Sequence, residues 1–109
     1  MYNHLILDIK LKEKITYLEA QKLLSKILNI LSLTKLKEEK HVFNNWGFTL
    51  FLLLSESHIS AHYRIEYDYL AIDIYSCNDI SVKEKDIISL FKNLWEAKLT
   101  KINRITFLQ

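Results

Sequence analysis

Apolar residues recur at strand spacing near the N-terminus and at helix spacing directly afterwards. Residues 4–11 (HLILDIKL) alternate loosely and are rich in β-formers, which predicts a strand. Thr16 and Glu19 then stand at capping-box spacing before an apolar-periodic stretch. That stretch predicts a helix lying on a sheet, because its apolar residues are expected on one broad face. The expected face comprises Leu18, Leu23, Leu24, Ile27, Leu28 and Leu31.

The middle of the chain has the pattern of consecutive strands. Residues 40–43 can form a strand, residues 44–47 offer turn chemistry, and the run FTLFLLLS at 48–55 predicts a buried central strand. Apolar and polar residues alternate over 59–66, which would place His62 and Glu66 on one side of a further strand. A hairpin turn at 68–69 then leads into LAIDIYSC, residues 70–77.

The C-terminal third predicts one more helix and one more strand. Ser81 and Glu84 have capping-box spacing ahead of an apolar-periodic stretch that runs from Ile87 to Trp95. Residues 101–108 can return as a final strand. The resulting order predicts an α+β fold, a two-layer sandwich of a mainly antiparallel β-sheet with two helices packed on one face. A chain of 109 residues fits one such domain, residues 1–109.

Composition and charge argue against several function classes. The formal net charge is only +2 and lysines are interleaved with glutamates, which argues against a nucleic-acid partner. The apolar run 48–54 is far shorter than the roughly 20 residues that span a bilayer, so no membrane partner is expected. One glycine and no proline leave no glycine-rich phosphate loop. A single cysteine and an N-terminus without signal-peptide features favour a cytoplasmic protein.

Several potentially reactive side chains lie close together in the second half of the chain. Taken singly, each has an ordinary reading: Ser57 as a turn residue, His62 as a half-exposed strand histidine, Glu66 as a solvated charge and Cys77 as a small buried hydrophobe. Cys77 with a histidine could also form a protease-like pair, but no oxyanion loop is evident. The candidates are Glu56, Ser57, His58, His62, Glu66 and Cys77.

A metal site is a second alternative, since the chain offers nitrogen and sulfur ligands. The histidines and the cysteine lack the CxxC or HxxxH pairing that structural zinc sites use, so no metal is expected. The candidate ligands are His41, His58, His62 and Cys77.

Taken together, residues 55–77 (SESHISAHYRIEYDYLAIDIYSC) resemble the processing-site region of bacterial-type S-adenosylmethionine decarboxylases. The usual pattern of that family is approximately ESHI, a strand ending in HTWPE, and then VDIFTC. The resemblance extends over nearly the whole chain, and a joint match at fixed separations is more specific than one short motif. Further matching positions are His4, Leu5, His41, Phe43 and Gly47, with Thr49 where the family has serine.

The resemblance implies that the chain cleaves itself between Glu56 and Ser57, giving a β-chain of residues 1–56 and an α-chain of residues 57–109. The Ser57 hydroxyl would attack the preceding carbonyl to make an ester, and elimination and hydrolysis would then leave a pyruvoyl group. His62 resembles the histidine that assists this processing by proton transfer, and Thr49 would supply a second hydroxyl.

The same resemblance implies a covalent pyruvoyl group derived from Ser57, with no metal and no pyridoxal phosphate. Its carbonyl can form a Schiff base with the substrate amine and accept electron density as carbon dioxide leaves. Cys77 resembles the acid that returns a proton to the α-carbon. Phe43 resembles the aromatic residue that stacks on adenine, with a core aromatic as the alternative, and Glu66 the carboxylate that binds the ribose hydroxyls.

The implied activity is decarboxylation of S-adenosylmethionine, a small-molecule substrate, to make the aminopropyl donor for spermidine, by a homodimer of processed protomers. Tyr63, Arg64 and Ile65 replace the usual Thr-Trp-Pro, and Arg64 could pair with Glu66 or bind a substrate carboxylate. An arginine or ornithine decarboxylase of the same family is therefore an alternative. A second alternative is an unprocessed, non-catalytic homologue that regulates a decarboxylase. The chain end at Gln109, without an extra tail, suggests a streamlined member.

Overall fold

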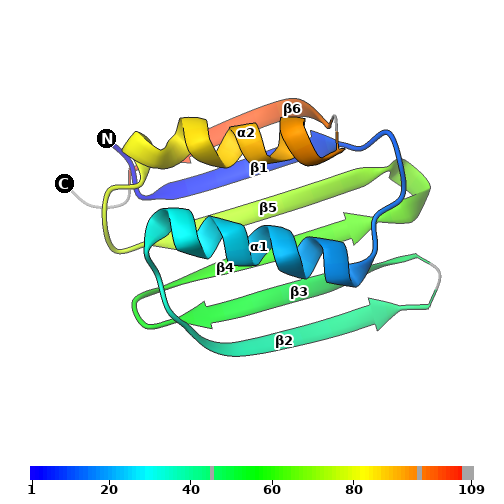
Figure 1. Cartoon of the computed structure of the whole chain (residues 1–109), viewed down its shortest axis with the longest axis horizontal. Helices are drawn as coiled ribbons and strands as arrows, with labels where there is room; N and C mark the ends of the chain where they lie inside the picture. The colour runs from blue at the N-terminus through cyan, green and yellow to red at the C-terminus, as the bar shows by residue number, and fades with distance from the viewer. Residues whose placement is uncertain (45, 96, 107–109) are drawn as a thin grey trace.

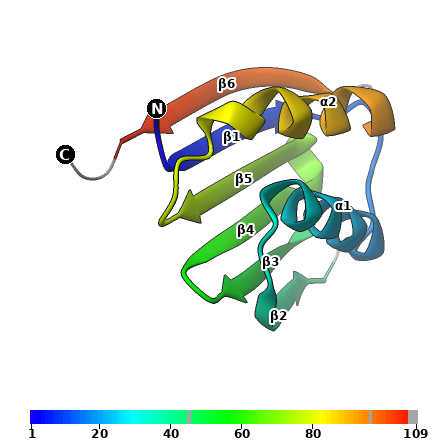
Figure 2. The ribbon, with the colours of Figure 1, turned by 60° about the vertical axis from the view of Figure 1, so that its left-hand side comes forward.

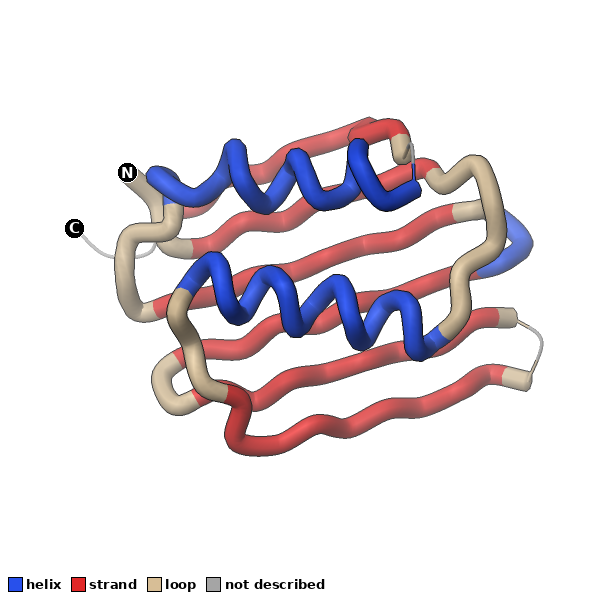
Figure 3. Tube along the Cα trace, in the orientation of Figure 1, coloured by secondary structure: helices blue, strands red, loops and turns tan. Residues whose placement is uncertain are grey.

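Two helices cover one face of a six-stranded sheet in the computed structural model, which describes residues 1–44, 46–95 and 97–106. Neighbouring strands pair antiparallel in the order β2-β3-β4-β5-β1-β6. Figures 1 and 3 show α1 and α2 side by side on the same side of the sheet, which confirms the predicted α+β two-layer sandwich. The elements are β1 (His4–Lys10), α1 (Tyr17–Leu31), β2 (Lys35–Phe43), β3 (Gly47–Leu54), β4 (Ser57–Arg64), the 3-10 turn η1 (Ile65–Tyr67), β5 (Tyr69–Ser76), the 3-10 turn η2 (Ser81–Lys83), α2 (Glu84–Trp95) and β6 (Lys98–Ile105).

The hydrophobic core lies between the helices and the inward face of the sheet. Every second residue of the strands that lie under the helices is buried there, as the period of two in a half-buried strand requires. Figure 2 shows both helices on this side, which leaves the opposite face of the sheet without a covering layer. Fully buried core residues include Leu5, Leu7, Ile9, Leu23, Leu24, Ile27, Leu50, Ile59, Ala61, Leu70, Ile72, Ile74 and Ile87.

Helix α1 starts as predicted, but one residue of its expected buried face is exposed. The Thr16 Oγ1 accepts a hydrogen bond from the Glu19 backbone N–H at 3.1 Å, and the Glu19 carboxylate accepts from the Thr16 N–H at 2.9 Å, which confirms the capping box. Leu18, however, is 61% exposed, and Ala20 takes a buried place instead. The reason is geometric: at 3.6 residues per turn, Leu18 lies nearly opposite Leu24 and Ile27.

The predicted capping box at the start of α2 is wrong. The turn η2 intervenes, α2 begins at Glu84, and the Ser81 hydroxyl donates to Asp79 Oδ1 at 2.6 Å. The Glu84 carboxylate accepts hydrogen bonds from Arg104 Nε at 2.5 Å and Nη2 at 2.9 Å, and from the Tyr2 hydroxyl. Glu84 therefore connects α2 to β6 and to the N-terminal segment, because a partnered arginine competes for the carboxylate that a capping box would need.

This connection predicts a pH dependence of stability. Arg104 holds the pKa of the Glu84 carboxyl below its ordinary value. A depressed pKa adds stability above the unfolded pKa, and that stability is lost as pH falls through the folded pKa. We expect the free energy of unfolding to fall less in Glu84→Gln than in the wild type between about pH 5 and about pH 2, measured by chemical denaturation. Glu39→Gln, at an exposed site, should follow the wild type, and an equal pH slope in Glu84→Gln would contradict the assignment.

The strand predicted to be buried, β3, is an interior strand of the sheet but is buried on only one face. Phe48, Leu50, Leu52 and Leu54 point toward the helices, whereas Phe51 and Leu53 are 37% and 43% exposed on the open face. An antiparallel sheet with helices on one side leaves its other side open in this way. Within the described residues, no helix has the length and apolar character needed to span a membrane. Apolar or aromatic side chains at open-face positions include Ile6, Phe51, Leu53, Ala71 and Tyr75.

Candidate functional site

Ser57 is the first residue of β4, directly after the turn from β3. Its backbone is in register with Ser76 of β5, and its side chain is buried. The Ser57 Oγ has no hydrogen-bond partner among the described residues. A buried hydroxyl left unsatisfied costs about 1–3 kcal/mol, so most buried hydroxyls are paired. A hydroxyl held without a partner at a strand end fits a reacting group better than a structural anchor.

The thiol of Cys77 lies on the peptide bond that precedes Ser57. Its Sγ donates to the Glu56 carbonyl oxygen at 2.6 Å. The pairing of Ser57 with Ser76 explains this contact, because Cys77 directly follows β5 and Glu56 directly precedes β4. Cys77 is exposed, so its expected reading as a small buried hydrophobe is wrong. A donor on a carbonyl oxygen makes the carbonyl carbon more electrophilic and stabilises the oxyanion that forms on attack.

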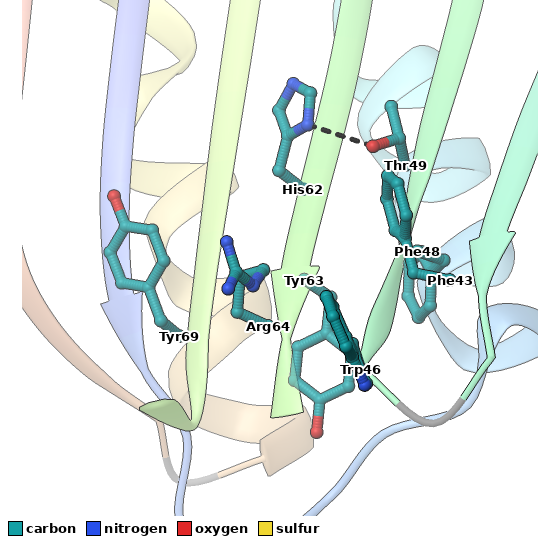
Figure 4. Close-up of a pocket in the computed structure, with 8 residues that line it drawn as sticks. All are labelled: Phe43, Trp46, Phe48, Thr49, His62, Tyr63, Arg64 and Tyr69. Atoms are coloured by element: carbon teal, nitrogen blue, oxygen red, sulfur yellow. Dashed lines mark hydrogen bonds between the residues drawn. The ribbon is translucent and has the colours of Figure 1, made fainter. Parts of the chain in front are cut away.

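Thr49 and His62 form a second group at the other end of these strands. They are register partners on β3 and β4, and Thr49 Oγ1 lies 3.1 Å from His62 Nδ1 (Figure 4). His62 is five residues from Ser57 along an extended strand, about 16 Å at roughly 3.3 Å per residue. The odd separation also places the two side chains on opposite faces of the sheet. One chain therefore does not bring His62 to Ser57.

The Thr49–His62 group lies in the wall of a pocket of about 430 Å³. Phe43, at the end of β2, also lines it and is 39% exposed, so the alternative of a core aromatic is wrong. The Phe43 ring meets the His41 ring edge-on at a centroid distance of 4.5 Å. Glu66 is absent from the described lining. The lining residues are Phe43, Trp46, Phe48, Thr49, His62, Tyr63, Arg64 and Tyr69, drawn in Figure 4.

Arg64 pairs with Glu66, which is one of the two roles that the sequence left open. Its Nη2 donates to the Glu66 carboxylate, and its guanidinium carbon lies 5.5 Å from the centroid of the Tyr67 ring. Glu66 stands in η1, beyond the end of β4, rather than on the strand beside His62 as expected. The structure thus shows Arg64 engaging the residue predicted to bind ribose.

Several pocket residues, among them Trp46, Tyr63 and Tyr69, were not among the site residues expected from the sequence. The only signal for Trp46 was its place beside the turn glycine. Tyr69 donates from its hydroxyl to Asp8, and this hydrogen bond raises the pKa of Tyr69 to about 12. Burial raises the pKa of Tyr63, whose hydroxyl accepts from the Ile15 N–H at 3.3 Å. Both phenols are therefore neutral near pH 7, and Arg64 supplies a permanent charge to the pocket wall.

A third group lies on the open face near Ser57. The His58 ring stacks between Phe51 and Tyr75 with centroids 5.6 Å from each, and Asp73 Oδ1 lies 2.6 Å from His4 Nε2 and 4.0 Å from His58 Nε2. Across residues 1–44, 46–95 and 97–106, no three His, Cys, Asp or Glu side chains lie together as metal ligands.

Comparison with known proteins gives a consistent family assignment. A family model described as S-adenosylmethionine decarboxylase matches residues 3–106. The S-adenosylmethionine decarboxylase proenzyme of Sulfurihydrogenibium sp. (strain YO3AOP1) is 46% identical over 66 residues, which are 60% of this chain and 50% of that protein. The proenzyme of Clostridium botulinum (strain Loch Maree / Type A3) is 35% identical over 72 residues, 66% of this chain and 62% of that protein. The chain thus spans about half the length of the first curated relatives it matches.

A solved structure shares the fold. The crystal structure of the adenosylmethionine decarboxylase from Aquifex aeolicus superposes with a TM-score of 0.70, covering 99% of this chain and 94% of that chain at 22% identity. That likeness concerns the arrangement of the sheet and helices, while the family model covers the sequence from residue 3 to residue 106. The chain belongs to the S-adenosylmethionine decarboxylase family.

Proposed function

We propose that this chain is a proenzyme that cleaves itself between Glu56 and Ser57, and that the processed protein decarboxylates S-adenosylmethionine. The observation that carries the proposal is the pairing of two features at one peptide bond. The Ser57 Oγ is buried with no partner in the described part of the chain, and the Cys77 thiol donates to the adjoining Glu56 carbonyl. The proenzyme names of the relatives add support.

Cleavage would proceed through the Ser57 hydroxyl. Its oxygen attacks the Glu56 carbonyl carbon, the C–N bond breaks, and an ester with a free amine forms. Loss of the Ser57 α-proton then breaks the ester C–O bond, which releases residues 1–56 with a Glu56 carboxylate and leaves dehydroalanine. Hydrolysis of dehydroalanine releases ammonia and leaves a pyruvoyl group on residues 57–109. The Cys77 thiol stabilises the charge that develops on the Glu56 oxygen during attack.

The pyruvoyl group fits this position because its precursor hydroxyl is buried, has no partner among the described residues, and follows the Glu56 carbonyl that the Cys77 thiol contacts. The group supplies an electron-accepting carbonyl for amino-acid decarboxylation, so neither metal nor pyridoxal phosphate is part of the proposal. In this proposal the Cys77 thiol, which contacts the adjoining Glu56 carbonyl, returns a proton to the substrate α-carbon. Phe43, exposed in the pocket wall, offers its ring to the adenine.

We further propose that the working form is a homodimer, because one chain keeps His62 and Thr49 about 16 Å from Ser57. A two-fold axis running across the strands, between two sheets stacked on their open faces, would lay the Ser57 end of one β4 over the His62 end of its partner's β4. Such stacking would also cover the exposed Phe51 and Leu53. The dimer therefore covers the apolar open face and brings the two ends of the divided site together along the strands. Proton transfer from the partner then requires the Ser57 side chain, which points toward the helices in one chain, to turn to the open face.

Carbon dioxide release from carboxyl-labelled substrates tests the activity. We expect the purified protein to release carbon dioxide from S-adenosylmethionine, because Phe43 and its pocket provide a surface for a nucleoside. Arginine and ornithine are assayed in parallel, since the Arg64–Glu66 pair engages the carboxylate that was predicted to bind ribose. If carbon dioxide is released only from arginine or only from ornithine, that amino acid is the substrate and the S-adenosylmethionine proposal is wrong. If fully cleaved protein releases carbon dioxide from none of the three, the decarboxylase assignment is contradicted.

A further inference from the structure

Aromatic rings form most of the pocket beside the β2–β3 turn, and two of its large apolar side chains, Phe43 and Trp46, are exposed. Phe43 is 39% exposed and Trp46 is 63% exposed, although tryptophan is highly buried on average. Both line the same pocket (Figure 4). Exposed aromatic rings that line a concave site are typical of ligand-binding surfaces.

The backbone of Trp46 is fixed on both sides. Its N–H donates to the Phe43 carbonyl at 2.7 Å, and its carbonyl accepts from the Ile65 N–H at 2.8 Å. The following Gly47 has a φ of +139°, and a Cβ there would stand 1.7 Å from the Tyr63 carbonyl oxygen. This close approach, open only to glycine, presses the turn against β4. The Trp46 indole is therefore exposed on a backbone that the fold holds in place.

Arg64 brings fixed hydrogen-bond donors to the same pocket. Arg64 is the register partner of Gly47, and Gly47 directly follows Trp46 in the sequence. Glu66 holds the guanidinium, and the Tyr67 ring lies beside it. A guanidinium has five N–H donors, so pairing with one carboxylate leaves donors free for a ligand. The pocket wall thus combines stacking surfaces with an oriented donor.

A purine base fits this combination better than an aliphatic amino acid. Its flat ring can stack on aromatic side chains, and its edge nitrogens accept hydrogen bonds from arginine. Ornithine has no ring to stack on these side chains. Arg64 also stands where the family pattern has tryptophan, so the indole that β4 lacks is supplied from the neighbouring turn by Trp46.

We propose that Trp46 and Arg64 are specificity-determining residues of a nucleoside subsite. Trp46 and Phe43 stack on the purine ring, and Arg64, oriented by Glu66, donates to a nitrogen at the edge of that ring. The inference rests on the proposed function and adds to it two residues that set the preference for a nucleoside over an amino acid.

Calorimetric titration of the purified full-length protein with adenosine tests this assignment. Adenosine has the base and ribose of the proposed substrate but not the α-amino group that reacts or the carboxyl group that leaves, so binding is measured without turnover. We expect Trp46→Ala and Arg64→Gln each to weaken adenosine binding about 10-fold, and Trp46→Phe to retain most of it. Leu36→Ala and Lys101→Gln remove an exposed leucine and an exposed charge outside the pocket and should bind as the wild type does.

A second readout separates direct stacking from a structural effect. In Trp95→Phe, Trp46 is the one remaining tryptophan, and adenosine should quench its emission saturably with the calorimetric Kd. An adenosine Kd that is unchanged in both Trp46→Ala and Arg64→Gln would overturn the inference. Quenching of the Trp46 emission by L-arginine or L-ornithine but not by adenosine would also overturn it. Self-cleavage and carbon dioxide release are measured independently, so the inference can fail while the proposed function stands.

Discussion

Replacing Ser57 by alanine is expected to abolish self-cleavage completely. The variant lacks the hydroxyl that attacks the Glu56 carbonyl, and no other group can form the ester or become the pyruvoyl carbonyl. Intact mass under denaturing conditions should show a single chain after prolonged incubation, and carbon dioxide release should be lost. Because the Ser57 hydroxyl is buried and none of the described residues is its hydrogen-bond partner, removing it should not lower the thermal unfolding midpoint.

The matched control is Ser55→Ala, which removes an exposed hydroxyl two residues earlier in the same turn. It should cleave as the wild type does. Ser57→Cys keeps a nucleophile at the position and should cleave, though at a changed rate. Cleavage at the same bond in Ser57→Ala would contradict the account, because the bond would then break without the proposed attack.

Co-expression of two defective chains is expected to restore cleavage that neither shows efficiently alone. His62→Ala should process about 10²–10⁴-fold more slowly than the wild type, the usual contribution of a positioned acid or base. Ser57→Ala cannot process at all. A mixed dimer joins the Ser57 of the first chain to the His62 of the second, so the His62→Ala chain should be cleaved. The fragments are identified by mass, since only that chain carries Ala at position 62.

Two further variants show whether pairing through the open face is required. Phe51→Asp, placed in the Ser57→Ala chain, puts a charge on the proposed contact and should remove the rescue. Leu18→Asp, at an exposed leucine of α1 on the helix side of the sheet, should leave the rescue intact. If the mixture cleaves no more than His62→Ala alone, the divided site is wrong. Cleavage of His62→Ala at the wild-type rate would exclude His62 from processing.

Much of the fold could be predicted because local patterns and tertiary structure agree. The segment 70–77, expected to follow a hairpin turn, matches β5, and the Thr16–Glu19 box starts α1 where the spacing indicated. The burial of the alternate residues of β5 under the helices follows from the same period of two. The layer order then follows, because a half-apolar sheet and two amphipathic helices have one common apolar surface to bury.

Tertiary contacts decided what the sequence could not. The strand expected at 40–43 begins earlier, at Lys35, because its lysines and glutamates are tolerated on an edge strand open to solvent. The Glu84 carboxylate is taken by Arg104, which lies 20 residues away along the chain, so the spacing of Ser81 and Glu84 was misleading. Long-range partners of this kind leave no local pattern in the sequence.

The site was predicted by residue type but not by geometry. Linear spacing gave Ser57, His62 and Cys77 as one group, while the antiparallel register joins Cys77 to Glu56 and leaves His62 on the opposite face. A separation of five residues along a strand implies both distance and opposite faces, so this division is a consequence of β4 being straight and extended. The sequence did not predict Trp46 as a site residue, because its place in the pocket depends on how the β2–β3 turn packs against β4.

Intact mass of the wild-type protein, measured under denaturing conditions after purification and incubation, tests the central claim most directly. The account predicts two fragments, residues 1–56 ending in an ordinary Glu56 carboxylate and residues 57–109 with a blocked pyruvoyl N-terminus in place of Ser57. A single uncleaved mass that persists on long incubation would contradict it and would favour a non-catalytic member of the family that binds or regulates a decarboxylase.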